Sequence, residues 1–237
     1  MGEPTSKTAS LDVTGYGFSQ DDLPELDHGP LDIRSWFQFD RAADSPAENV
    51  AAPDAGGAAL DLEIGSGKGT FLVQQAGLEP GVDFLGIEWS KKFWRLAADR
   101  ARRHGLGNVR LLWADATVFV RNFVAQESLR RVHIYFPDPW PKARHNKRRS
   151  VQAPFLRELH RVLQPGGEVR LATDHAEYFA WMEDHAAQVA ELFERRPFER
   201  PASAGEGELV GTNFERKYIA EGRAFQAMVL VKRDASR

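Results

Sequence analysis

The sequence predicts an α/β fold with a doubly wound, mostly parallel sheet, and three observations support this prediction. From Ala58 onward, short apolar runs alternate with amphipathic segments, as expected for strands joined by crossover helices. A glycine-rich turn follows the first apolar run, at a position where such sheets bind ligands. Acidic residues also stand at or just beyond the ends of four successive apolar runs, which places four carboxylates at one edge of the sheet.

The elements follow this alternation in chain order. The first strand ends in the glycine-rich turn, and Ser90 and Ser150 stand where the N-caps of two later helices are expected. Pro137 and Pro139 end the fourth strand, because proline lacks the N–H that a strand ladder needs, and Pro165 ends the fourth helix. Strands are therefore expected over 59–64, 83–88, 108–114, 131–136, 168–173 and 224–232, and helices over 68–77, 90–104, 116–126, 150–163 and 175–194.

Residues 1–57 are expected to form an acidic, largely flexible extension, and residues 58–237 the catalytic domain. The extension holds eleven Asp or Glu and three Lys or Arg, a formal charge of −8, so the chain's net charge of −3 leaves +5 for the domain. Residues 31–39 contain three aromatic side chains, and we expect this segment to pack on the domain. Positive charge is therefore concentrated in the part of the chain that carries the candidate site.

Composition excludes several classes of protein and mechanism. A chain of 237 residues with 42% apolar content is long and apolar enough for one α/β domain with an appendage. It contains no cysteine, which excludes disulfides, thiolate metal sites and sulfur nucleophiles. No apolar run approaches the ~20 residues that cross a bilayer, so we expect a cytoplasmic protein with no membrane partner.

The glycine-rich turn, Gly-Ser-Gly-Lys-Gly at residues 65–69, indicates a ligand that approaches the backbone closely. A glycine there leaves no Cβ in the way, and Glu63 stands two residues before the turn. A dinucleotide fingerprint needs Gly-x-Gly-x-x-Gly, but here the third glycine comes one residue early, which disfavours a nicotinamide cofactor. The alternative is a tight strand-to-helix turn that binds nothing.

Three further acids follow later strands. Glu88 ends the second strand, where a carboxylate can accept both ribose hydroxyls of an adenosine. Asp115 follows the third strand and could accept from an adenine amino group, and Asp138 lies between two prolines after the fourth. Glu88 or Asp115 alone would more often be a solvated strand-end acid or a helix cap. Together with Glu63, they indicate a ligand site at this edge.

A cationic run begins just after this last acid. From Lys142 to Arg149, five of eight residues are Lys or Arg, the composition expected where several phosphates are bound. Such a run alone could be a solvated face, but its place directly after Asp138 favours an anionic polymer beside a reaction centre. Trp140 could stack on a base or simply close the loop. His133 and His145 have no second His or acid at metal-ligand spacing, so no metal is expected.

These motifs closely resemble those of the bacterial tRNA (guanine-N7)-methyltransferases of the TrmB type. The most specific match is FPDPWPK at 136–142, continued by RHNKRR at 144–149. The resemblance covers roughly residues 58–232. It also includes EIGSGKG at 63–69, GIE at 86–88, NVR at 108–110, DA at 115–116, QxPF at 152–155, LATD at 171–174 and TNFER at 212–216.

The resemblance implies a Rossmann-like class I methyltransferase fold with a seven-stranded sheet, and methyl transfer from S-adenosylmethionine to N7 of guanine 46 in the tRNA variable loop. It places Asp138 beside the reaction centre as the catalytic residue. It implies that the cofactor is contacted by Glu63, Gly65, Gly67, Glu88, Asp115, Ala116 and Asp138. It implies that tRNA is contacted by Lys142, Arg144, His145, Asn146, Lys147, Arg148, Arg149, Asp174, Thr212, Asn213, Phe214 and Glu215. The family usually has a lysine where this chain has Asn213.

Two other functions stay open. A class I methyltransferase for another substrate would keep the fold, and a catalytically silent RNA-binding partner subunit would keep the scaffold without the chemistry. The matched substrate positions argue against the first, and the intact acids at four strand ends argue against the second. The sequence does not distinguish a monomer from a homodimer.

Overall fold

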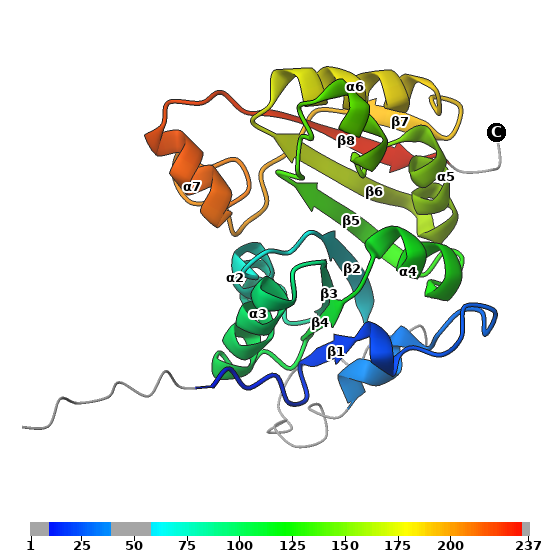
Figure 1. Ribbon diagram of the computed structural model, residues 1–237, viewed down its shortest axis with the longest axis vertical. Coiled ribbons are helices and arrows are strands. Elements are labelled where there is room, and N and C mark those ends of the chain that lie inside the picture. The colour runs from blue at the N-terminus through cyan, green and yellow to red at the C-terminus, as the bar shows by residue number, and fades with distance from the viewer. Residues whose placement is uncertain (1–9, 39–57, 234–237) are drawn as a thin grey trace, which may run out of the picture.

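The sheet of the protein carries helices on both faces (Figure 1). The computed structural model describes residues 10–38 and 58–233. Its eight strands lie in the order β1-β4-β3-β2-β5-β6-β8-β7; β8 is antiparallel to β6 and β7, and all other neighbours are parallel. In chain order they are β1 (Gly17–Ser19), β2 (Ala59–Ile64), β3 (Val82–Glu88), β4 (Val109–Trp113), β5 (Leu129–Tyr135), β6 (Leu163–Thr173), β7 (Phe193–Arg196) and β8 (Gln226–Lys232).

The strand order reverses at β2, which pairs with β3 on one side and with β5 on the other. Glu63 of β2 therefore lies opposite Gly86 of β3 and His133 of β5. A crevice forms at such a switch point because the two connections leave the carboxyl ends of β2 and β5 in opposite directions. Glu63, at the end of β2, thus lies at the point where open α/β sheets bind ligands.

Two groups of helices cover the two faces (Figure 1). One face packs against α2 (Thr70–Leu78) and α3 (Lys91–Arg103), and its core includes Phe84 of β3 and Trp94 of α3. The other face packs against α4 (Ala116–Phe123), α5 (Ala153–Val162) and α6 (Ala176–Ala187). A further helix, α7 (Asn213–Ala220), lies near the carboxyl ends of β5 and β6. The short 3-10 turns are η1 (Gln20–Asp22), η2 (Ile33–Phe37) and η3 (Ala143–Arg148).

Close packing at the switch point depends on one glycine. A Cβ added to Gly86 would lie 2.3 Å from Leu72 Cδ1 and 2.7 Å from Leu111 Cδ1, distances at which atoms overlap. Only a residue without a side chain lets α2 approach β3 this closely. The glycine turn after β2 is thereby held against β3.

The sheet has eight strands, whereas seven were expected, because part of the expected extension joins it. Phe18 of β1 pairs with Leu112 of β4, and its ring stacks on Trp36 at 4.4 Å. Ile33 and Phe37 are buried in the core. β1 and η2 therefore pack on the domain, while residues 1–9 and 39–57 of the expected extension lie outside the described residues.

The element boundaries differ from expectation in the second half. The helix expected over 150–163 begins at Ala153, because Pro154 fits the first helical turn, and Gln152 rather than Ser150 is its N-cap residue. The helix expected over 175–194 ends at Ala187, and β7 occupies its last residues. Ser90 caps α3 as expected. Among the described residues, no helix is long and apolar enough to cross a bilayer.

Candidate active site

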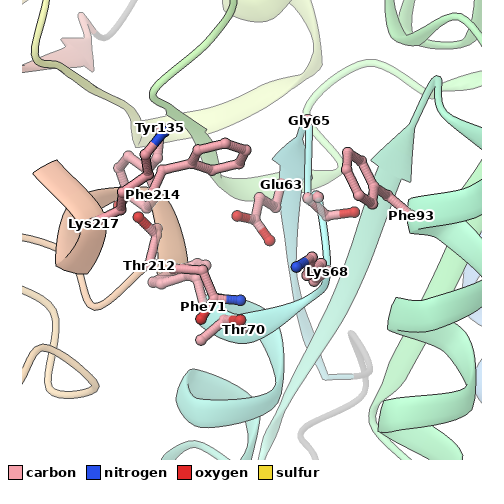
Figure 2. Close-up of a pocket in the computed structure, with 13 residues that line it drawn as sticks. Glu63, Gly65, Lys68, Thr70, Phe71, Phe93, Tyr135, Thr212, Phe214 and Lys217 are labelled. Carbon is pink, nitrogen blue, oxygen red and sulfur yellow. The ribbon is translucent and has the colours of Figure 1, made fainter.

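A cavity of about 210 Å³ opens at the carboxyl ends of β2 and β5 (Figure 2). The glycine turn, the first turn of α3, the end of β5 and the start of α7 all contribute to it. Its lining residues are Glu63, Gly65, Ser66, Gly67, Lys68, Thr70, Phe71, Phe93, Tyr135, Thr212, Asn213, Phe214 and Lys217. The expected cofactor residues of β2 therefore meet the expected substrate residues of α7 in one cavity.

The glycine turn adopts a backbone conformation that side chains disfavour. Gly67 has φ +54° and Gly69 has φ +69°, both in the left-handed region. A Cβ on Gly69 would also lie 2.8 Å from the Cβ of Ala97 on α3. The alternating glycines are therefore explained by backbone geometry and by helix packing, while Gly65 and Gly67 also line the cavity.

Glu63 is a buried carboxyl whose Oε2 atom has no hydrogen-bond partner among the described residues. Figure 2 shows its carboxylate pointing into the cavity. Burial, together with the nearby carboxylate of Glu88, raises the pKa of Glu63 to about 8. An unsatisfied buried acid facing a cavity is suited to a ligand that brings a positive charge or an N–H donor.

Glu88 holds the glycine turn in place. Its Oε2 atom accepts the Gly67 backbone N–H at 2.8 Å, and its Oε1 atom accepts that of Ser90 at 2.7 Å. Each carboxylate oxygen keeps further acceptor capacity, so a ligand hydroxyl can still bind. Glu88 thus connects the glycine turn after β2 to the residues that precede α3.

Asp115 and Asp138 lie on the same edge of the sheet but do not line the cavity. Asp115 caps α4, since its Oδ1 atom accepts the backbone N–H groups of Thr117 and Val118 at 2.8 and 3.1 Å. Ala116 is the first residue of that helix. Asp138 is exposed in the turn that leaves β5.

The cavity wall opposite the glycine turn is formed by the start of α7. Thr212 caps this helix, because its hydroxyl oxygen accepts the Glu215 backbone N–H at 3.1 Å. Asn213 and Phe214 follow it into the wall, and a Cβ on Gly67 would lie 3.6 Å from the Phe214 ring. The helix therefore sits directly over the expected cofactor loop.

Glu215, expected to contact the substrate, is buried and bonded to its own chain in this structure. Its side chain is fully buried, and its carboxylate accepts the backbone N–H groups of Leu209, Val210 and Gly211. A carboxylate with three backbone donors has little left to offer a ligand. Glu215 instead holds the loop before α7.

The cationic segment, residues 142–148, lies on the surface next to Asp138. Lys142, Arg144, Lys147 and Arg148 are exposed, and His145 and Asn146 are half-buried. The guanidinium of Arg148 lies over the Trp140 ring at 4.9 Å. Arg149, also expected to contact RNA, differs from the rest of the run, because it is only 2% exposed.

Asp174, another expected substrate residue, is paired with a cation of the same chain. Its Oδ2 atom lies 2.6 Å from Nη1 of Arg223, a residue that lies just after the end of α7. A substrate that used this carboxylate would have to share it with Arg223. The pair connects the carboxyl end of β6 to the α7 segment.

Sequence reasoning missed several cavity residues, above all Tyr135, whose place in an apolar strand favours the core. Its hydroxyl bonds to His133 Nδ1 at 2.9 Å, and His133 Nε2 bonds to Asp61 at 3.1 Å. Strand alternation could have shown this, since residues 133 and 135 share the face that α2 covers. The other missed residues are Ser66, Lys68, Thr70, Phe71, Phe93 and Lys217. Among the described residues, no group of three His, Cys, Asp or Glu side chains could hold a metal ion.

Comparison with known proteins identifies the family. A family model described as "Putative methyltransferase" matches residues 58–228. A protein of Nocardioides sp. named "tRNA (guanine-N(7)-)-methyltransferase" is 38% identical over 203 residues, which are 85% of this chain and 79% of that protein. One of the same name from Alkalilimnicola ehrlichii is 40% identical, over 73% and 72% of the two chains.

Solved structures with low identity share the fold. The 16S rRNA methyltransferase KamB aligns with a TM-score of 0.52 at 17% identity, over 75% of this chain and 88% of that chain. The antibiotic-resistance methyltransferase Kmr aligns with a TM-score of 0.51 at 22% identity, over 80% and 96%. The fold is therefore the Rossmann-like class I methyltransferase fold. With curated relatives at 35–40% identity over most of its length, the chain belongs to the tRNA (guanine-N7)-methyltransferase family.

Proposed function

We propose that the protein transfers a methyl group from S-adenosylmethionine to N7 of guanine 46 in the tRNA variable loop. One observation carries most of this proposal. A cavity with an unsatisfied buried carboxyl, that of Glu63, opens at the switch point of the sheet, and a cationic surface segment begins four residues after Asp138. A site for a cationic small molecule thus lies close to a site for a polyanion, as methylation of RNA requires.

The residues of the cavity fit the cofactor. S-adenosylmethionine supplies an electrophilic methyl group carried on a sulfonium centre. Glu63 suits its cationic amino group. Glu88 does not line the cavity but holds the glycine turn beside it, and it has acceptor capacity for the ribose hydroxyls. Gly65 and Gly67 leave the loop without side chains at the cavity. We place Asp115, Ala116 and Asp138 around the remaining parts of the cofactor.

Methyl transfer to guanine N7 depends on the positioning of the two reactants more than on proton transfer. Guanine N7 carries a free lone pair and needs no deprotonation before it attacks the methyl group, so no strong general base is required. Holding the two reactants in line can supply most of the rate enhancement. Positive charge develops on the purine during transfer, and the exposed carboxylate of Asp138 is available to stabilise it. We also propose that the reaction needs no metal.

Residues 142–148 would bind the tRNA backbone. Four of them are exposed cations, and Trp140 with the guanidinium of Arg148 presents a flat surface suited to a base. Asp174, Thr212, Asn213 and Phe214 would face the guanine from the other side. Because tRNA is the substrate, we place the reaction in the cytoplasm.

The test is transfer of a labelled methyl group from S-adenosylmethionine to unmodified tRNA, followed by borohydride and aniline cleavage. This treatment breaks RNA at N7-methylguanosine. Cleavage at position 46, absent from a tRNA with adenosine there, is expected. Labelling of another nucleotide would contradict the proposed position, and no labelling despite cofactor binding would contradict tRNA as the substrate.

A further inference from the structure

Arg149 ends the cationic run, but its guanidinium faces the protein interior. The side chain is only 2% exposed, whereas the neighbouring Arg148 is on the surface. Burying a guanidinium is unfavourable unless each face and each donor finds a partner. The partners of Arg149 therefore indicate what the residue does.

Those partners are the turn after β5 and the helix α6. Its Nε donates to the Pro139 carbonyl oxygen at 2.8 Å, and its Nη2 donates to Glu177 at 2.9 Å. The guanidinium also lies over the rings of Tyr178 and Trp181, at 5.0 Å from each centroid. One side chain thus ties the peptide that follows Asp138 to a rigid helix.

The turn that Arg149 contacts has an unusual backbone. Phe136 has φ +50° and Trp140 has φ +44°, values that are uncommon for residues with large side chains. Such a conformation persists only where surrounding contacts determine it. Two hydrogen bonds hold this turn, one on each side of Asp138 along the chain. Before Asp138, the Phe136 N–H donates to the Ala172 carbonyl oxygen at 2.8 Å, and after Asp138, Arg149 donates to the Pro139 carbonyl oxygen.

We propose that Arg149 is a positioning residue for methyl transfer, which fixes the Asp138 turn through the Pro139 carbonyl and does not bind RNA. This inference rests on the proposed function, in which Asp138 lies at the reaction centre. It gives two adjacent arginines different roles. Arg148 binds the substrate, and Arg149 holds the Asp138 carboxylate in position. A lysine could not replace Arg149, because a point charge lacks the planar fork that donates to Pro139 and Glu177 and lies over the rings of α6.

The test compares Arg149→Met, Arg149→Lys and the matched variant Arg148→Met, which removes the same charge one residue earlier. Both Arg149 variants are expected to lower kcat at saturating tRNA, the methionine variant by roughly 10- to 100-fold, because small misplacements of a reacting group have effects of this size. The affinity for tRNA should stay within about twofold of wild type. Arg148→Met should instead weaken tRNA binding, because its side chain is an exposed cation.

The proposal would be overturned if Arg149→Met lost as much tRNA affinity as Arg148→Met and kept the kcat of the wild type. If Arg149→Met does not fold, Arg149→Lys decides, because lysine keeps the positive charge and the long stem but not the planar fork. That variant should lower kcat in the same direction, and an unchanged kcat would overturn the proposal.

Hydrogen exchange gives a readout that does not depend on activity. The segment 136–142 should exchange faster in Arg149→Met than in Arg148→Met, and equal exchange would overturn the proposal. A wild-type protein that leaves tRNA unmethylated would contradict the proposed function instead, so the two failures are distinguishable.

Discussion

The carboxylate of Glu215 accepts the backbone N–H of Gly211 at 2.7 Å, and so ties α7 to the loop that precedes it. The same carboxylate accepts the N–H of Val210 at 2.9 Å. Because Asn213 and Phe214 on this helix line the cavity, the bond from Glu215 determines the position of one cavity wall.

Glu215→Gln should therefore destabilise the fold and weaken cofactor binding together. An amide has one acceptor oxygen where the carboxylate has two, so at least one buried N–H loses its partner, at a cost of about 1–3 kcal/mol. Urea unfolding and calorimetric titration with S-adenosylmethionine measure the two effects. Glu206→Gln, an exposed change in the same loop, is the control and should change neither. Normal stability in Glu215→Gln would contradict this role.

Cofactor binding should release a proton from Glu63 below pH 8. The pKa of this carboxyl is raised by burial and by Glu88 to about 8, so the group is largely neutral at pH 7 without ligand. A cationic amino group beside it favours the ionised form. Titration calorimetry in buffers of different ionisation enthalpy should detect the released proton at pH 7, and Glu63→Gln should abolish it.

The same pKa predicts how stability depends on pH without cofactor. The folded pKa of Glu63 lies above the ordinary value of 4.5, so the folded state binds more protons than the unfolded state between these pH values. This contribution to stability is complete below pH 4.5 and is lost as pH rises to about 8. Glu63→Gln should flatten that part of the stability profile, and an identical profile would contradict the raised pKa.

Asp138→Asn should reduce turnover much more than tRNA binding. The asparagine keeps the size of the side chain but cannot stabilise the positive charge that develops on guanine. We expect kcat to fall roughly 100-fold, as when one charge-stabilising group is removed from a reaction centre. Single-turnover kinetics at saturating tRNA measure this step. Equal losses in kcat and tRNA affinity would count against the assignment.

Replacing both Arg144 and Arg148 by methionine should weaken tRNA binding in a salt-dependent way. Both side chains are exposed cations, and removing each cation that neutralises a phosphate should reduce the slope of log affinity against log salt by about 1. Filter binding from low to moderate salt measures the slope. Arg157→Met, on the exposed face of α5, is the control and should leave the slope unchanged. A slope unaffected by the double variant would remove this segment from the RNA interface.

Gly86→Ala should destabilise the protein, because the new Cβ would overlap Leu72 and Leu111. Overpacking of this kind costs about 1–3 kcal/mol. Gly77→Ala is the matched control, since a Cβ on that α2 residue meets nothing within 4 Å and alanine favours the helix by about 1 kcal/mol. Thermal denaturation should therefore shift in opposite directions for the two variants. A shift in the same direction would contradict the packing at β3.

Most of the sheet could be predicted from local pattern. The strand predicted over 59–64 is β2. The strand predicted over 83–88 is β3, which begins one residue earlier, and the strand predicted over 108–114 is β4, which is one residue shorter at both ends. Apolar runs of this length, separated by amphipathic helices, leave few alternatives. β7 was missed because its residues, Phe193–Arg196, are mostly charged and exposed, and it is stabilised by pairing with β8.

The sequence by itself determined the family, the α/β fold and the edge at which the acids and the glycine turn meet, because these depend on motifs of a few adjacent residues and on the regular geometry of parallel strands. Only the tertiary structure decided which of the matched residues are exposed and which are buried with partners of the same chain. Arg149 and Glu215 carry charges that suit RNA and guanine, but Arg149 pairs with Glu177, and Glu215 accepts the backbone N–H groups of residues 209–211. Burial depends on partners brought together by folding, and no local pattern contains them.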